Sequence, residues 1–452
     1  MHNLTNKYGE IYMKILFISL GCDKNLVDSE IMMGLLRARG YEFTDDETVA
    51  DVIVVNTCGF INDAKEESIN TILEMAEYKK QNLKALIVTG CLAQRYKDEI
   101  LDELPEIDAI VGTTAFDTIC DVVDDVLARK KHNEFNDINR LCRPDADRII
   151  TTGGFYSYLK IAEGCDKRCT YCSIPLIRGS YRSVPMEKLV KEAEYLADKG
   201  IKELIIVAQE TTVYGKDLYG KKMLPTLLHK LCEIKGIEWI RLLYCYPEEI
   251  TDELIDTIKN EKKICNYIDM PIQHASDNIL KKMGRRTNNA ELREIIGKLR
   301  KEIPDICLRT TLITGFPGET EEDHEILMDF IDEMEFDRLG VFTYSPEEDT
   351  AAALMENQVD EEVKLTRKDE LMELQQEISA DKSSGLIGKK LEVIIEGQAS
   401  DEDVYVGRSY MDAPGVDGYV FIKTEEDLMS GDFAYVEITK SLEYDLIGEL
   451  TV

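Results

Sequence analysis

The feature that most constrains this sequence is a repeated strand-then-helix pattern in which three predicted strands each end at a cysteine. Short apolar runs rich in β-branched residues lead into Cys22, Cys58 and Cys91, and helical patterns separate them. This alternation predicts a parallel sheet covered by helices over residues 13–128. The carboxyl ends of parallel strands share one edge of a sheet, where such folds bind ligands. We therefore expect three thiols from distant positions to converge in one crevice.

A second set of three cysteines, Cys165, Cys169 and Cys172, follows another predicted strand in the compact pattern CxxxCxxC. Thiolates on short loops hold iron–sulfur clusters. A zinc site usually has a fourth Cys or His at its own spacing, and the sequence has none nearby. A disulfide or zinc site remains the alternative interpretation. Three thiolates cannot complete a four-iron cubane, so each set would leave one iron open for chemistry.

The rest of the chain divides by pattern into a linker and two further domains. Residues 129–152 are polar and mixed, which indicates a linker. Residues 153–384 hold six strand candidates with helical patterns between most of them, too few for a complete eight-unit barrel. Residues 385–452 have short strands joined by Gly, Asp and Pro turns, the pattern of a small antiparallel barrel. Residues 1–12 are polar and are expected to be an unstructured extension or a misassigned start.

Composition limits the class of partner and the cellular compartment. The 452 residues carry a net charge of −34, from 54 basic and 88 acidic side chains. Such a field repels phosphate backbones and favours a basic partner, although many microbial proteins are simply acidic. The sequence shows no signal peptide and no apolar run of about 18 residues, so we expect a cytoplasmic protein without a membrane partner. In a reducing cytosol, clustered cysteines indicate metal ligands or redox groups.

With these motifs in place, the chain resembles the radical S-adenosylmethionine methylthiotransferases over nearly its whole length. CxxxCxxC after the first strand of a partial (β/α)6 barrel resembles the radical S-adenosylmethionine superfamily, and SLGCDKNLVDSE, NTCGFINDAKEES and TGCLAQRY resemble the three amino-terminal cysteine blocks of the methylthiotransferases. The resemblance implies a flavodoxin-like amino-terminal domain, a partial radical S-adenosylmethionine barrel and a terminal OB-like TRAM barrel. It also implies two [4Fe-4S] clusters, held by Cys22, Cys58 and Cys91 and by Cys165, Cys169 and Cys172, with S-adenosylmethionine on the second.

The family reaction that this resemblance implies has two stages. One S-adenosylmethionine methylates sulfur at the amino-terminal cluster, and a second is cleaved to a 5′-deoxyadenosyl radical that removes a hydrogen atom from the substrate carbon. The carbon radical then takes the methylthio group. An unactivated C–H bond has no acidic proton, so we expect no protein general acid or base. A low-potential electron donor and a sulfur donor are implied as partners.

Four stretches favour the branch of the family that modifies the β-carbon of an aspartate in the small-subunit ribosomal protein uS12. IDMPIQHAS, RGSYRSVP, LRTTLITGFPGET and TYSPEEDTAAA resemble that branch more than the branch that modifies adenosine 37 of tRNA. Glu347, Glu348 and Asp349 at the barrel mouth would repel tRNA phosphates and attract a basic ribosomal protein. The alternatives are a tRNA methylthiotransferase and a non-catalytic iron–sulfur electron carrier or scaffold.

Six more residues lie in the cluster loop or near strand ends and are predicted to contact the cofactor: Tyr171, Gln209, Glu210, Thr211, Arg309 and Gly315. The run Gln-Glu-Thr resembles the family's cofactor-amine region. Tyr171 would pack a purine or be plain core. Arg309 would hold a carboxylate of the cofactor or of the target aspartate. Gly315 would approach the cofactor through backbone amides, or form an ordinary strand-to-helix turn.

Two sets of residues near these motifs are expected to have no functional role. Lys167 and Arg168 lie inside the cluster loop and are expected to be solvated. The other six cysteines lack a site context and are expected to be structural thiols: Cys120, Cys142, Cys232, Cys245, Cys265 and Cys307.

Overall fold

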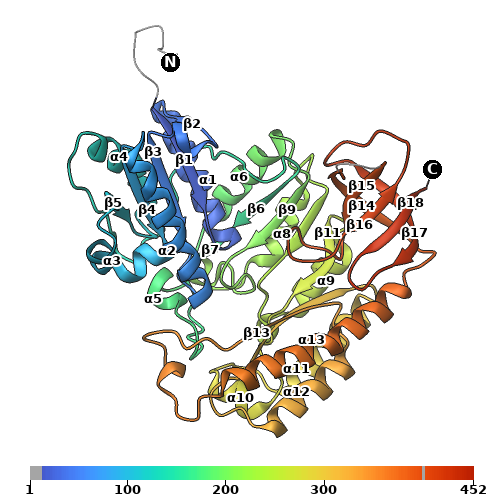
Figure 1. The fold of residues 1–452 in the computed structure, drawn as a ribbon. Helices are drawn as coiled ribbons and strands as arrows, with labels where there is room; N and C mark the ends of the chain where they lie inside the picture. The colour runs from blue at the N-terminus through green and yellow to red at the C-terminus, as the bar shows by residue number, and fades with distance from the viewer. Residues whose placement is uncertain (1–12, 400–402, 452) are drawn as a thin grey trace.

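The computed structural model describes residues 13–399 and 403–451, so the predicted extension over residues 1–12 lies outside the described residues. Figure 1 shows the central barrel in the middle of the molecule, with the amino-terminal sheet on one side and the terminal barrel on the other. The predicted fold class, a parallel sheet domain followed by a partial (β/α)6 barrel and a small β-barrel, is confirmed.

The amino-terminal domain is a five-stranded sheet in the order β2-β1-β3-β4-β5, with every pair parallel. This is the flavodoxin-like order. Its strands are β1 (Lys14–Ser19), β2 (Glu42–Phe43), β3 (Val52–Thr57), β4 (Ala85–Gly90) and β5 (Ala109–Val111), and its helices are α1 (Asp23–Arg39), α2 (Asn62–Ala76), α3 (Cys91–Glu103) and α4 (Ile119–Leu127). Strands β3 and β4 are buried along their whole length because helices cover both faces of the sheet.

The segment predicted as a linker is firmly packed against the amino-terminal domain. Residues 129–152, all of them described, form no helix or strand beyond an isolated bridge between Val111 and Glu134. The backbone N–H of Ile149 donates to the Glu30 carbonyl, and the N–H of Thr151 donates to the Glu30 carboxylate at 2.7 Å. The segment therefore joins the domains while its last residues lie along α1.

The central domain is an open barrel of six parallel strands in the order β6-β9-β10-β11-β12-β13, and all six predicted strands are present. The strands are β6 (Tyr156–Lys160), β9 (Glu203–Val207), β10 (Trp239–Leu242), β11 (Ile264–Asp269), β12 (Cys307–Thr314) and β13 (Arg338–Thr343). The longer helices are α6 (Met186–Asp198), α8 (Leu224–Cys232), α9 (Asp252–Asn260), α11 (Asn289–Glu302), α12 (Glu321–Met334) and α13 (Glu361–Ser384), and the short ones are α5 (Ile174–Arg178), α7 (Lys216–Tyr219) and α10 (Asp277–Lys282). Apolar side chains between strands and helices form its main core.

Local sequence signals set several of these boundaries. Helices α11 and α12 each begin with a capping box, made by Asn288 with Glu291 and by Thr320 with Asp323. Two short strands, β7 (Ala162–Glu163) and β8 (Arg182–Ser183), pair antiparallel and close the base of the loop that carries CxxxCxxC. The loop is therefore held at both ends.

The terminal domain is a closed barrel in the order β14-β15-β16-β18-β17, in which only the β16–β18 pair is parallel. Its strands are β14 (Lys390–Gln398), β15 (Val404–Ser409), β16 (Val420–Lys423), β17 (Phe433–Ser441) and β18 (Leu446–Leu450). A buried ionic group joins it to the central barrel: the Glu203 carboxylate accepts from Arg241 at 2.8 Å and from Arg408 at 2.6 Å. Because these buried charges are paired, they fix the two barrels against each other.

Candidate functional site

The structure brings the three amino-terminal cysteines together at one edge of the sheet. Cys22 caps the start of α1, Cys58 comes directly after β3, and Cys91 comes directly after β4 as the first residue of α3. All three therefore lie at the carboxyl ends of parallel strands. Cys91 is buried, Cys58 is half-buried and Cys22 is exposed, so the group opens toward solvent from a buried base.

Two glycines allow the three cysteine loops to approach so closely. A Cβ at Gly21, whose φ is +85°, would lie 2.8 Å from the Cys58 Cβ and 3.1 Å from its Sγ. A Cβ at Gly59 would lie 2.9 Å from the backbone nitrogen of Leu92, the residue after Cys91. The separations of 2.8 Å and 2.9 Å are shorter than real Cβ contacts, so only glycine leaves room at these two positions.

The electrostatics of this group suit thiols that a metal cluster converts to thiolates. Burial, with smaller contributions from the neighbouring Cys91 and Cys22 thiols, raises the pKa of Cys58 to about 11. Burial also raises the pKa of Cys91, and the Arg178 guanidinium opposes that rise. The raised pKa of Cys58 and Cys91 favours the protonated thiol in both, and metal binding would release those protons.

The donor set fits an iron–sulfur cluster better than a single ion. Within residues 13–399 and 403–451, no three His, Cys, Asp or Glu side chains are arranged to hold one metal ion. The thiolates of a cluster bind different iron atoms, so they need not meet at a single point. Three cysteines around one glycine-lined opening satisfy that weaker condition.

The second triad lies on the loop between β7 and α5. The backbone N–H of Lys167 donates to the Cys165 Sγ at 3.5 Å, and the N–H of Cys172 donates to the Cys169 carbonyl at 3.1 Å. Burial raises the pKa of Cys165 to about 12. A backbone N–H bonded to a ligand sulfur is a feature that tunes iron–sulfur clusters, so this loop also fits a cluster.

The prediction that Lys167 is solvated is wrong, because three carboxylates from the segments that follow β9 and β10 surround it. Its Nζ lies 2.7 Å from Glu249, 3.0 Å from Glu248 and 3.4 Å from Glu210. Burial raises the pKa of Glu210 to about 7 against the opposing effect of the Lys167 charge. Lys222 also pairs with Glu249 at 2.7 Å, so two lysines face three carboxylates and the group favours a proton on Glu210 near neutral pH. Arg168 is exposed, as predicted.

The other residues at the end of β9 face the same region. Gln209 donates from Nε2 to the Glu163 carboxylate at 3.0 Å, while its Oε1 is buried without a hydrogen-bond partner among the described residues. Thr211 is fully buried and donates to the Leu243 carbonyl at 2.8 Å, which ties β9 to β10. Tyr171 packs edge-to-face on Phe316 with 6.4 Å between ring centroids.

Arg309 and Gly315 already have protein partners. Arg309 pairs through Nη1 with Asp269 at 2.8 Å and through Nε with Asp417 of the terminal barrel at 3.2 Å. Gly315 has a φ of +72°, and a Cβ there would lie 2.2 Å from the Lys364 Cγ, so α13 requires this glycine. Cofactor contacts from either residue stay predictions.

The acidic run after β13 has a different role from the one predicted for it. The Glu347 side chain is only 3% exposed and pairs with Arg95 at 2.7 Å and Lys65 at 3.1 Å, both in the amino-terminal domain. Its charge is neutralised there, so the prediction that Glu347 attracts a substrate is wrong. Glu348 and Asp349 are exposed. The Glu347 ion pairs fasten the open side of the barrel to the amino-terminal domain.

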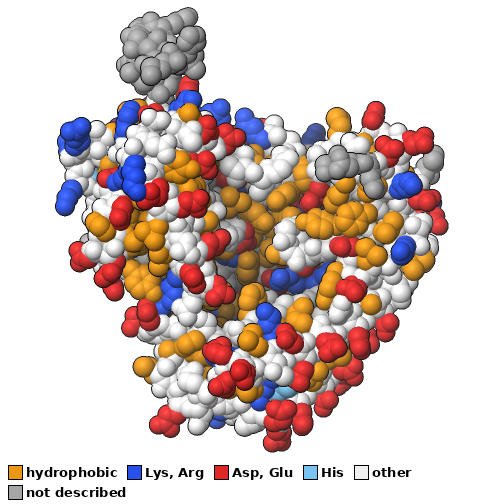
Figure 2. All heavy atoms as spheres, viewed as in Figure 1, with side chains coloured by type: hydrophobic (Ala, Val, Ile, Leu, Met, Phe, Trp, Pro, Cys, Tyr) orange, Lys and Arg blue, Asp and Glu red, His pale blue; other side chains and the backbone are white. Residues whose placement is uncertain are grey.

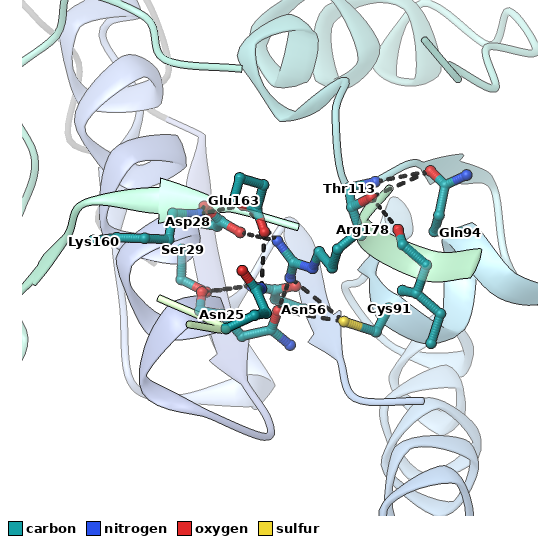
Figure 3. Close-up of polar contacts among 12 residues, drawn as sticks. Asn25, Asp28, Ser29, Asn56, Cys91, Gln94, Thr113, Lys160, Glu163 and Arg178 are labelled. Carbon is teal, nitrogen blue, oxygen red and sulfur yellow. Dashed lines mark hydrogen bonds and ion pairs between the residues drawn. The ribbon is translucent and has the colours of Figure 1, made fainter. Parts of the chain in front are cut away.

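Sequence reasoning also missed Arg178, which joins the two cysteine loops. It ends α5, directly after the CxxxCxxC loop, and its Nη2 donates to the Cys91 Sγ at 3.4 Å (Figure 3). Its Nη1 donates to Asp28 at 2.8 Å and to Glu163 at 3.1 Å. The only signal in the sequence was its place in the block RGSYRSVP.

A hollow lies between the amino-terminal domain and the terminal barrel. Figure 2 shows hydrophobic side chains along its walls and acidic side chains over the surrounding surface. Near the barrel mouth the Tyr244 hydroxyl donates to Asp23 at 3.2 Å, and the Lys24 Nζ lies 3.3 Å from the centroid of the Tyr244 ring. The first turn of α1, which begins directly after Cys22, therefore contacts the mouth of the central barrel.

Comparison with known proteins agrees with this arrangement. Three family models match: an uncharacterized protein family over residues 14–112, the radical SAM superfamily over 159–331 and the TRAM domain over 387–451. The ribosomal protein uS12 methylthiotransferase RimO of Lachnoclostridium phytofermentans is 66% identical over 96% of this chain and 99% of its own. The chain belongs to this methylthiotransferase family. The family protein of Acetivibrio thermocellus is 53% identical over 97% of this chain and 98% of its own.

A solved structure with the same fold extends the comparison. The radical S-adenosylmethionine methyltransferase TsrM from Kitasatospora setae has a TM-score of 0.54 at 13% identity, over 76% of this chain and 74% of its own. At that identity only the fold is shared. The family and the superfamily together make this chain a radical methylthiotransferase that uses an iron–sulfur cluster and S-adenosylmethionine. No helix in the described part of the chain is both long and apolar enough to cross a membrane.

Proposed function

We propose that this enzyme adds a methylthio group to the β-carbon of an aspartate in ribosomal protein uS12. The name of its relatives supports this substrate, since the identity extends over nearly the full length of both chains. The observation that carries the proposal is the contact between the two cysteine loops, in which Arg178 beside CxxxCxxC reaches Cys91 of the other triad. A transfer between two centres requires them to be neighbours.

We assign one [4Fe-4S] cluster to each triad. Cys165, Cys169 and Cys172 would hold the cluster that binds S-adenosylmethionine, and the amino-terminal triad would hold the second. When bound, these groups supply an organic radical and a transferable methylthio group. Gln209 has a buried free acceptor, Oε1, which suits a cofactor ammonium group.

The chain's own residues bind and orient, and none is assigned as a general acid or base. Removal of a hydrogen atom from a saturated carbon transfers no proton to a protein group. Tyr171 lies next to Cys172 and packs edge-to-face with Phe316, and it would limit the cofactor's position. Thr211 keeps the ends of β9 and β10 together.

Charge supports a basic protein as the substrate. Glu347 no longer contributes, but the net charge of −34 and the acidic surface around the hollow remain. Such a surface attracts a lysine- and arginine-rich protein and opposes nucleic-acid phosphates. A low-potential electron donor and a sulfur donor complete the proposed set of partners.

The test offers both candidate acceptors to the same enzyme. The iron-reconstituted chain is incubated with reductant and S-adenosylmethionine, with either uS12 or unmodified tRNA present. Mass spectrometry then searches each for a hydrogen replaced by SCH₃. The proposal expects the group on an aspartate of uS12 only. Modified tRNA beside unmodified uS12 would overturn it, and no consumption of S-adenosylmethionine would indicate an electron carrier or scaffold.

A further inference from the structure

Arg178 stands where the amino-terminal domain meets the barrel mouth. Its side chain is 2% exposed, and Figure 3 shows its guanidinium between residues of both domains. Nη1 donates hydrogen bonds to two carboxylates, Asp28 of α1 and Glu163 of β7. Nη2 donates instead to two uncharged side chains, through the Cys91 Sγ and the Asn25 amide oxygen. The two edges of the guanidinium therefore have separate partners.

The charge balance of this buried group gives Cys91 a particular place in it. Lys160 also pairs with Asp28 and Glu163, so two cations face two carboxylates. The set is already neutral without Cys91. A Cys91 thiolate would add a fifth charge that these buried ion pairs do not need. The thiolate becomes favourable when it binds a metal cluster.

The same group continues to the cofactor region. Glu163 accepts from Gln209 Nε2 at 3.0 Å through its other carboxylate oxygen. Gln209 in turn keeps a buried acceptor free. A continuous series of contacts thus runs from Cys91 through Arg178 and Glu163 to Gln209, at the end of the second barrel strand.

Asn25 reinforces the amino-terminal end of this series. Its Nδ2 donates to the Thr57 carbonyl at 2.9 Å and to the Leu20 carbonyl at 3.2 Å. Those carbonyls precede Cys58 and Cys22, respectively. Arg178 therefore holds Cys91 directly and, through Asn25, the loops that carry the other two cysteines.

We propose that Arg178 is a positioning residue that holds Cys91 as a cluster ligand, raises the reduction potential of the amino-terminal cluster and keeps that cluster in register with the cofactor pocket. The proposal rests on the assignment of the amino-terminal triad as cluster ligands. Hydrogen bonds to ligand sulfurs and nearby positive charge stabilise the reduced, more negative cluster. Loss of the donor must then lower the potential.

The experiment isolates the amino-terminal cluster in the full-length chain. Cys165, Cys169 and Cys172 are replaced by alanine, and the reconstituted protein is titrated electrochemically with detection by electron paramagnetic resonance. Arg178→Met is then added. We expect the ratio of reduced to oxidised cluster to fall about tenfold at a fixed potential, a shift of about 59 mV for a one-electron couple. Arg178→Lys, which keeps the charge without the planar fork, should shift it less in the same direction.

Arg95→Met is the matched control. Arg95 lies on α3 with Cys91, its side chain is 7% exposed, and its partners are Glu347, Gly59 and Glu348 rather than Sγ. It should shift the potential much less than Arg178→Met; an equal shift would overturn the proposal, because bulk charge would then explain the effect. An Arg178→Met protein that binds iron normally and has an unchanged reduction potential would overturn the proposal as well.

The design separates this inference from the proposed function. If the alanine-substituted parent binds no iron, the cluster assignment fails and both proposals fall. If the parent binds iron normally and the reduction potential is the same with and without Arg178→Met, only this inference fails. Should Arg178→Met not fold, Arg178→Lys decides, and an unchanged potential in that variant overturns the role of Arg178.

Discussion

The two cysteine triads are built in opposite ways. The barrel triad lies on one short loop whose base is closed by the β7–β8 pair. The amino-terminal triad comes from three separate strand ends that are spaced by whole strand-helix units. Two glycines allow the three cysteine loops to approach one another closely. A local site depends on its own loop, whereas an assembled site depends on the sheet and on contacts between domains. Damage to interdomain contacts should therefore affect the amino-terminal triad first.

The largest effect should come from the local site itself. Cys169→Ala removes a proposed ligand of the cluster that binds the cofactor, so 5′-deoxyadenosine formation should fall below about one hundredth of wild type, since even outer partners of metal ligands cost 10–100-fold. Liquid chromatography of the reaction measures it. Cys120→Ala is the control, because that half-buried thiol lies on α4, outside both sets of cysteine loops. Normal 5′-deoxyadenosine formation by Cys169→Ala would contradict the assignment of this loop as the one that holds the cofactor-binding cluster.

The assembled site should be uniquely sensitive to one methyl group. Gly21→Ala places a Cβ 2.8 Å from the Cys58 Cβ at a φ of +85°, so the amino-terminal cluster should be lost and bound iron should fall to about half. Gly40→Ala is the control, because its φ is +102° and no atom lies within 4 Å of the added Cβ. Iron analysis and 5′-deoxyadenosine formation are measured together. Full iron content in Gly21→Ala would contradict the tight approach of the loops.

The interdomain ion pairs should separate the two sites functionally. Glu347→Gln leaves Arg95 and Lys65 without their buried carboxylate, at a cost of about 1–3 kcal/mol in the free energy of unfolding. We expect several-fold less methylthio transfer for each 5′-deoxyadenosine formed, with cofactor cleavage unchanged. Asp349→Asn, at an exposed neighbour, should change little. An equal loss of cleavage and transfer in Glu347→Gln would break the distinction between the sites.

The smallest effect concerns acidity beside the barrel triad. Burial raises the pKa of Glu210 to about 7, above its ordinary value near 4.5, so the folded state binds a proton more tightly than the unfolded state. The stability that this proton gives is full below pH 4.5 and is lost as pH rises to about 7, by at most about 1.4 kcal/mol per pH unit. Relative to Glu210→Gln, wild type should lose thermal stability across that interval. Parallel pH profiles of the two proteins would contradict the shift.

Much of the fold followed from periodicity. The six barrel strands and the strands that precede Cys22, Cys58 and Cys91 have strong apolar patterns, and parallel topology then places the three cysteines at one sheet edge. The cysteine loop of the barrel was apparent because its residues are adjacent in sequence. In both places local pattern and global fold agree.

The polar contacts could not be predicted in the same way. Glu347 and Arg95 are 252 residues apart, and Arg178 and Asp28 are 150 apart. Which charges meet depends on how the domains dock, and no local pattern encodes that. Lys167 was misjudged for the same reason, since its carboxylates come from the ends of β9 and β10.

The central claim is that the two triads have different roles in one reaction, and a single comparison tests it most directly. The enzyme with Cys22, Cys58 and Cys91 replaced by alanine is incubated with S-adenosylmethionine, reductant and uS12, and both 5′-deoxyadenosine and methylthiolated uS12 are measured. We predict that 5′-deoxyadenosine still forms while uS12 gains no SCH₃ group. Methylthiolated uS12 from this variant would contradict the claim.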